Sequence, residues 1–141
     1  MLKVYMEKLI PLRKTFSICK HKFSSYSLDQ YDFESNIDFK NHPAIYIFSH
    51  RTKRNLLETP YKFKFVHYLL YGGKTENART RFNDHHKLSE LKGRANTISI
   101  CYCKENQLIN IENELLKKYN FKYNTMNNIA DGPHSIIEED L

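Results

Sequence analysis

The sequence predicts a small mixed α/β (α+β) domain whose core elements follow the order strand, strand, helix, strand, helix. Short runs of β-branched and aromatic residues alternate with longer segments in which apolar residues recur at helical spacing. The 141 residues suit one domain with a sizeable core and an appended segment.

Two apolar runs predict the first two strands. Residues 44–48 and 65–71 are rich in β-branched and aromatic side chains, and the second run ends at a glycine pair. Residues 51–55 and 58–60 between them are polar and turn-like, so we expect a hairpin with a long loop. This loop either faces DNA or is simply solvated, and its basic residues are Arg51, Lys53, Arg54, Lys62 and Lys64.

The remaining elements follow from caps and periodicity. We expect Thr75 to cap a helix that runs to about Leu91, because its hydroxyl can accept a bond from an unpaired N–H group. Residues 97–103 alternate polar and apolar side chains as a third strand does, and residues 107–119 have helical spacing. Residues 1–41 show a weaker pattern and are interpreted as an arm that packs on the core. The acidic end, residues 136–141, is expected to be frayed.

The charge of the chain is unevenly distributed. The net charge of +6 favours a polyanionic partner, because lysines and arginines that neutralise phosphates release counterions. Residues 61–94 hold eight basic and three acidic residues, whereas residues from 95 onward hold four basic and seven acidic ones. The positive field is therefore expected around the first predicted helix.

Cysteine content and hydropathy exclude some classes of protein. The three cysteines, Cys19, Cys101 and Cys103, match neither a disulfide framework nor a zinc knuckle, so we expect them to be reduced. No apolar stretch is long enough for a membrane span, and the N-terminal residues carry charges where a signal peptide would have a continuous apolar segment. We therefore expect a cytoplasmic protein with no membrane partner.

Glu112 occupies an unusual position on the second predicted helix. At about 100° per residue it falls within the apolar stripe, between Leu108 and Leu116. An unpaired carboxylate buried there would cost several kcal/mol or more. Glu112 is therefore expected to form a salt bridge with Arg81 or Lys74, to reach solvent at the rim, or to bind one Mg²⁺ or Mn²⁺ ion.

The first predicted helix presents two further polar side chains. Arg81 and His85 lie one turn apart beside its inner face. Either can be an ordinary surface residue, but Lys74 and two glycines at the start of the same helix favour an arginine that clamps a phosphate. Tyr46 and Tyr71 fall on adjacent predicted strands, where each on its own would most often be a core or interface aromatic.

In order, the chain carries Ala44-Ile45-Tyr46, Tyr71-Gly72-Gly73, Arg81, His85, Glu112 and Asn124. This ordered set resembles the signature of the GIY-YIG nucleases over residues 43–128. The resemblance implies a three-stranded, mostly antiparallel sheet flanked by helices, with residues 1–42 as an N-terminal arm and residues 129–141 as a tail. Ala44 and Gly72 depart from the signature, where the family has a glycine and an isoleucine.

The resemblance implies an endonuclease that hydrolyses DNA phosphodiester bonds with one Mg²⁺ or Mn²⁺ ion held by Glu112. Arg81 and Lys74 would offset charge on the phosphate, and Tyr46 would position or deprotonate the attacking water. Tyr71 and His85 would orient water and phosphate, and Asn124 would brace the site. RNA cleavage would use the same residues, and cutting both DNA strands would require a homodimer or two successive nicks. The alternative is an inactive module that binds nucleic acid or a protein partner as an inhibitor or regulator.

Overall fold

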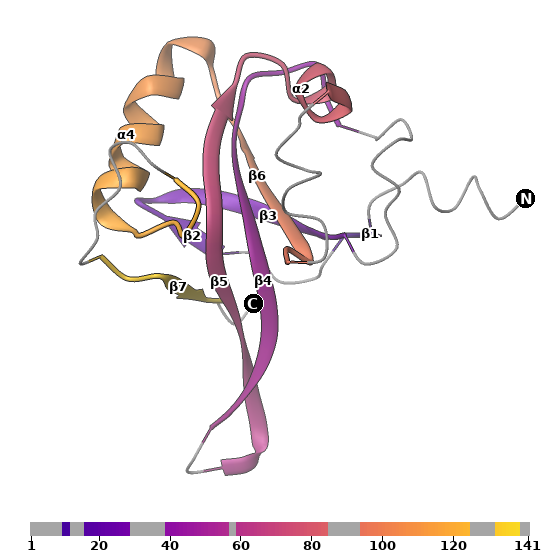
Figure 1. Cartoon of the computed structure of the whole chain (residues 1–141), viewed down its shortest axis with the longest axis vertical. Helices are drawn as coiled ribbons and strands as arrows, with labels where there is room; N and C mark the ends of the chain where they lie inside the picture. Colours follow the sequence, from indigo (N-terminus) through magenta and orange to yellow (C-terminus); the bar gives the residue numbers. More distant parts are fainter. Residues whose placement is uncertain are drawn as a thin grey trace, which may run out of the picture.

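The chain folds as an α+β structure built on one curled antiparallel sheet (Figure 1). The computed structural model describes residues 10–11, 16–28, 39–56, 59–84, 94–124 and 132–138. The sheet order is β1-β3-β6-β4-β5-β7, and β2 pairs separately with β3. In chain order the elements are β1 (Ile10–Pro11), β2 (Phe16–Ile18), β3 (His21–Ser27), β4 (Ala44–Leu56), β5 (Thr59–Thr75), α2 (Ala78–Asp84), β6 (Thr97–Tyr102), the 3-10 helix η1 (Glu105–Gln107), α4 (Leu108–Lys118) and β7 (Ser135–Ile137).

β4 is the central strand, since it pairs with β5 on one side and with β6 on the other. Ala44, Tyr46 and Phe48 point to one face of the sheet, and Ile45 and Ile47 point to the other. All five side chains are fully buried. A strand covered on both faces needs a continuous apolar run, which is why this segment was recognisable in the sequence.

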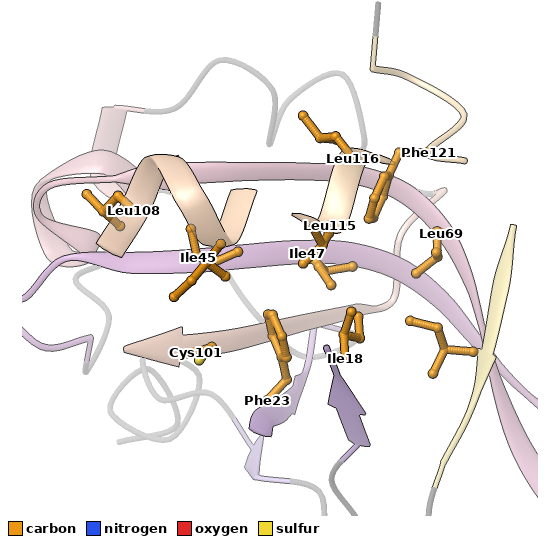
Figure 2. Close-up of a cluster of buried hydrophobic side chains, with 12 residues drawn as sticks. Ile18, Phe23, Ile45, Ile47, Leu69, Cys101, Leu108, Leu115, Leu116 and Phe121 are labelled. Carbon is orange, nitrogen blue, oxygen red and sulfur yellow. The ribbon is translucent and has the colours of Figure 1, made fainter. Parts of the chain in front are cut away.

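The two helices cover opposite faces of the sheet. α4 packs on the face of Ile45 and Ile47, and Figure 2 shows its apolar residues meeting those of the strands. α2 lies against the other face, where Ala78 packs with Tyr46 and Phe48. Figure 1 shows α4 and α2 on either side of the β4–β5 hairpin. The buried residues of α4 form one stripe: Leu108, Ile111, Leu115 and Leu116.

The β4–β5 hairpin is longer than predicted, and its far end extends beyond the other elements (Figure 1). The predicted loop is wrong where the structure describes it, because residues 51–55 belong to β4 and residues 59–60 to β5, while residue 58 lies outside the described residues. The register places Lys53 opposite Phe65 and Asn55 opposite Phe63. Polar residues on one strand therefore face aromatic residues on the other, and the ladder continues although the β4 segment is polar.

The described part of the N-terminal arm supplies strands to the sheet. β3 pairs with β6 from Ser24 to Ser27, and Ile18 and Phe23 are buried beneath α4. The hydroxyls of Ser25 and Ser99 lie 2.8 Å apart between these two strands. The sheet therefore has more strands than the three expected. Those three are β6, β4 and β5, which lie at its centre.

The C-terminal tail also contributes a strand. β7 pairs with β5 over Val66 to Tyr68, and Ile136 and Glu138 are buried. The expectation of a frayed end is wrong for residues 136–138, while residues 139–141 lie outside the described residues. The β-branched pair Ile136-Ile137 suits a half-buried edge strand, with Ile136 inside and Ile137 exposed.

The other predicted elements agree with the structure within their bounds. The third strand, expected at residues 97–103, is β6, and the helix expected at residues 107–119 is η1 followed by α4. α2 is described as far as Asp84, so the rest of the helix expected up to Leu91 lies outside the described residues. In the described part of the chain, no helix has both the length and the apolar character needed to cross a membrane.

Candidate functional site

Tyr46 is packed across the glycine of the neighbouring strand. It lies opposite Gly73, on the same face of the sheet, and its side chain is fully buried. A Cβ atom placed on Gly73 would lie 2.6 Å from the Tyr46 hydroxyl oxygen and 2.7 Å from its Cζ. Any larger residue at position 73 would collide with the phenol, so Tyr46 in this position requires a glycine at position 73.

The hydroxyl of Tyr46 connects two other predicted site residues. Tyr71 lies beside it, with 6.1 Å between ring centroids. Burial raises the pKa of the Tyr46 phenol, as do its contacts with Tyr71, and the hydrogen bond that the Arg81 guanidinium donates to it offsets only part of this rise. Tyr46 therefore stays protonated. A buried, protonated phenol is poorly suited to deprotonate a water, and the group that its hydroxyl contacts is the Arg81 guanidinium.

Arg81 extends from α2 and is exposed, so it can reach both the Tyr46 hydroxyl and a ligand in solvent. The residue that caps α2 is Asn77, whose side-chain oxygen accepts a hydrogen bond from the N–H of Thr80 at 3.2 Å. The prediction that Thr75 caps the helix is wrong, because its hydroxyl instead accepts the N–H of Asn77 at 3.1 Å. Thr75 therefore shapes the turn that leads into the helix.

The start of α2 is not an anion site. The N–H groups of Ala78 and Arg79 donate to the carbonyls of His42 and Lys40, at 3.0 and 3.3 Å. These donors, which would otherwise attract a phosphate, are already used. The expected contribution of the helix N-terminus is therefore wrong, and Arg81 itself is an exposed group of α2 that can bind an anion.

Lys74 and Glu112 lie on the other face of the sheet. Lys74 is opposite Ile45 on the strand pair, and its Nζ is 3.6 Å from the Glu112 Oε1. The Lys74 side chain is 41% exposed and that of Glu112 is 21% exposed. Of the alternatives left open by the sequence, the ion pair with Lys74 is present, and the partial exposure of Glu112 shows that its carboxylate also reaches solvent. Both groups remain accessible from solvent.

Asn124 holds the backbone of Gly72. Its side-chain oxygen accepts the N–H of Gly72 at 2.9 Å, and its amide donates to the Gly72 carbonyl at 2.8 Å. This double contact takes the place of a further strand beside β5. Phe121 packs below the same glycine, where a Cβ atom would lie 3.1 Å from the phenyl ring. Asn124 therefore braces Gly72, and its role in a catalytic site stays a prediction.

The predicted residues form two groups around residues 71–74 of β5. Tyr46, Tyr71 and Arg81 lie on the face covered by α2. Lys74 and Glu112 lie on the face covered by α4. The two groups therefore approach the same part of the strand from opposite sides, and do not meet above one face. His85 lies outside the described residues.

Of the predicted site residues, Glu112 is the one expected to bind a metal ion. Among the described residues, no group of three or more His, Cys, Asp or Glu side chains is arranged to hold a metal ion. Mg²⁺ is commonly bound through one or two carboxylates together with substrate phosphates and waters. A carboxylate oxygen of the partly exposed Glu112 suits such a site. The Lys74 ammonium would then move away from Glu112 or bind a phosphate.

A second polar cluster, which sequence reasoning missed, lies at the middle of the hairpin. His67 is fully buried, with its Nδ1 3.0 Å from the Ser49 Oγ and its Nε2 2.7 Å from the Glu138 Oε1. Arg51 also binds Glu138, through Nε and, at 3.3 Å, through Nη2. The sequence held one indication of this cluster, which is the histidine within the apolar run 65–71, because a buried imidazole needs hydrogen-bond partners.

This cluster holds the hairpin together and does not perform nucleophilic chemistry. Serine, histidine and carboxylate follow one another as in a hydrolase, but Ser49 is 0% exposed and no substrate can reach its oxygen. Burial by itself would raise the pKa of Glu138, but hydrogen bonds from His67 and Arg51 outweigh it and lower the pKa below its ordinary value. Glu138 is therefore a buried, charged anchor between β7 and the hairpin.

Comparison of the chain with protein-family models, with curated proteins and with solved structures gave no match in any of the three.

Proposed function

We propose that the protein is a divalent-metal-dependent endonuclease that hydrolyses DNA phosphodiester bonds through a site of the GIY-YIG type. The observation that supports this best is the pair of Glu112 and Lys74, in which a partly exposed carboxylate lies beside a partly exposed ammonium next to residues 71–74 of β5. Arg81 supplies a second cation near the same segment, from the opposite face of the sheet. All three side chains keep contact with solvent, as groups that receive a large substrate must.

Glu112 would hold the metal ion. Its carboxylate is a hard oxygen donor and is partly exposed, and the cation beside it is a lysine that is itself 41% exposed. When bound, Mg²⁺ or Mn²⁺ acts as a Lewis acid that stabilises negative charge on the leaving oxygen. Lys74, once released from Glu112, would neutralise a neighbouring phosphate oxygen.

Arg81 would bind the scissile phosphate. A guanidinium can donate two parallel hydrogen bonds to phosphate oxygens, and it stabilises charge that grows on them during hydrolysis. Tyr46 would keep the guanidinium in place through its hydroxyl, since the phenol is fully buried and cannot itself touch DNA. Tyr71 is partly exposed and would orient the attacking water. Asn124 would hold Gly72, and with it the part of β5 that carries Tyr71 and Lys74.

The test is cleavage of supercoiled plasmid DNA in Mg²⁺ by the wild type and by Glu112→Gln. The matched control is Glu114→Gln, which removes an exposed carboxylate two residues further along α4. We expect Glu112→Gln to lower the cleavage rate by at least about a hundredfold, the scale of losing one key electrostatic group. Glu114→Gln should cut like the wild type. Equal cutting by the wild type and Glu112→Gln would rule out the metal site.

The second candidate is an inactive module with the same fold that binds nucleic acid or a protein partner. The ion pair between Lys74 and Glu112 favours it, because that pair leaves the carboxylate partly neutralised. Calorimetric titration with Mn²⁺ distinguishes the two. Binding that Glu112→Gln abolishes supports the nuclease, and tight DNA binding without any metal binding supports the inactive module. Parallel digestion of RNA and DNA oligonucleotides identifies the substrate.

A further inference from the structure

The far half of the β4–β5 hairpin is a basic ribbon. We define the distal ribbon as residues 51–56 of β4 with residues 59–65 of β5. From residue 51 to residue 65 the chain has five basic residues and one acidic residue, Glu58. At about 3.3 Å per residue, the six residues of the β4 side span roughly 20 Å. Figure 1 shows this end of the hairpin extending beyond the helices and the other strands.

Cations occupy both faces of the distal ribbon. Residues directly opposite each other in an antiparallel pair share a face, and neighbours along a strand alternate. Lys53 therefore shares its face with Phe65, while Arg54 shares the other face with Lys64. Lys53 and Arg54 are both exposed. A flat anionic surface would require cations on one face only, whereas a groove with phosphates on two walls matches cations on both.

The ribbon is held at its base and stiffened along its length. Arg51 is neutralised by Glu138, and its guanidinium carbon lies 3.5 Å from the centroid of the Phe65 ring. The Nζ of Lys53 lies 3.9 Å from the centroid of Phe63, and the two phenyl rings meet edge to face at 5.4 Å. Arg51 is thus an anchor, and Lys53 and Arg54 are the described, exposed cations available to a partner.

We propose that the distal ribbon enters the major groove of duplex DNA and that Lys53 and Arg54 bind phosphates on its opposite walls. This inference rests on the proposed function in that duplex DNA is the substrate. The major groove is about 12 Å wide and admits a two-stranded β-ribbon. Single-stranded DNA is disfavoured, because it binds by stacking bases on aromatic rings, and Phe63 and Phe65 each already carry a cation on one face.

The test measures binding of a labelled duplex, roughly two helical turns long, to the full chain in buffer containing EDTA. Metal-free conditions separate binding from cleavage, so failure of the proposed function leaves this result interpretable. The variant is Lys53→Gln/Arg54→Gln. The control is Lys22→Gln/Lys117→Gln, which removes the same charge from two exposed lysines outside the ribbon. Melting temperatures check that each variant is folded.

Affinity is measured between about 50 and 200 mM salt. We expect the ribbon variant to lower the slope of log affinity against log salt by about 1.8, because each phosphate contact contributes about 0.9. Lys53→Arg/Arg54→Lys, which keeps both charges, should retain the wild-type slope, and the control should lose much less. A ribbon variant that binds the duplex like the control would overturn the proposal. So would a single strand of the same sequence that binds more tightly than the duplex.

Discussion

The two ends of the β4–β5 hairpin use the same strand pairing in opposite environments. At one end, residues 44–49 and 69–75 lie between α4 and α2, with side chains buried on both faces. At the other end, the distal ribbon carries the exposed cations Lys53 and Arg54, and Lys53 lies over the ring of Phe63. The difference teaches that burial, and not strand pairing, decides what a polar group can do. The buried Tyr46 can position a neighbour, whereas the exposed Lys53 and Arg54 can bind a partner.

The cluster of Ser49, His67, Arg51 and Glu138 lies where the two environments meet. Ser49 and His67 are fully buried, whereas the Arg51 side chain is 17% exposed. Glu138 brings a charge from β7 to this boundary and thereby fixes the ribbon on the body of the protein. Loss of this anchor should therefore lower the free energy of unfolding more than a substitution at the buried end of the hairpin.

Glu138→Gln tests the cluster at this boundary. We expect it to lower the free energy of unfolding by about 3 kcal/mol, at the lower end of the range for breaking a buried ion pair, because Arg51 keeps some exposure. The measurement is urea denaturation at neutral pH. Glu105→Gln, at an exposed carboxylate of η1, is the control and should change the free energy much less. A loss no larger than that of the control would show that the anchor contributes little.

The same anchor predicts a dependence of stability on pH. The pKa of Glu138 is lowered in the folded protein from its ordinary value of 4.5. The contribution of Glu138 to the stability of the folded protein is therefore complete above about pH 4.5. It is lost as the pH falls through the pKa of Glu138 in the folded protein, because the unfolded chain binds the proton first. The wild type should lose stability more steeply than Glu138→Gln below that pH. Parallel curves for the two proteins would contradict the assignment.

Gly73→Ala tests the buried end of the hairpin. The added Cβ would lie 2.6 Å from the hydroxyl of Tyr46, whose ring has no room to move. We expect a loss of roughly 1–3 kcal/mol, as for other overpacked cores, measured by urea denaturation. The matched control is Gly72→Ala, where the nearest atoms are 3.1 Å away on the ring of Phe121. It should cost less, and a reversed order would mean that Tyr46 can shift.

Lys74→Met tests the ion pair beside Glu112 and should have the smallest effect on stability. Both side chains are partly exposed, and such pairs contribute less than about 1 kcal/mol. We expect thermal and urea unfolding to change little in Lys74→Met and in Glu112→Gln. A loss of several kcal/mol in either variant would assign the pair a structural role and weaken the case for a metal ligand.

The central strands and α4 could be predicted because buried segments have a recognisable pattern of apolar residues in the sequence. Ile45 and Ile47 on one face, with Tyr46 and Phe48 on the other, make a continuous apolar run that few alternatives fit. The distal ribbon could not be predicted in this way. Its β4 strand is polar, and the aromatic residues that support it come from β5, which only the register reveals.

The residues proposed for the candidate site could be chosen from the sequence, but their positions relative to one another could not. Glu112 stands out because it interrupts an apolar stripe, yet the helix pattern cannot tell which cation it meets. The identity of the α2 cap was missed because Thr75 and Asn77 are equally good capping residues on sequence grounds. Glu138 was missed because its partners, Arg51 and His67, are distant in sequence.

The most direct test is single-turnover cleavage of one labelled duplex in Mg²⁺, followed over a range of protein concentrations. It reports the maximal rate and the concentration at half-maximal rate separately. The account predicts that Lys53→Gln/Arg54→Gln raises the concentration needed for half-maximal rate, and that Glu112→Gln lowers the maximal rate. A ribbon variant that saturates at the wild-type concentration, or a Glu112→Gln variant that reaches the wild-type maximal rate, would contradict the division of roles between the two ends of the hairpin.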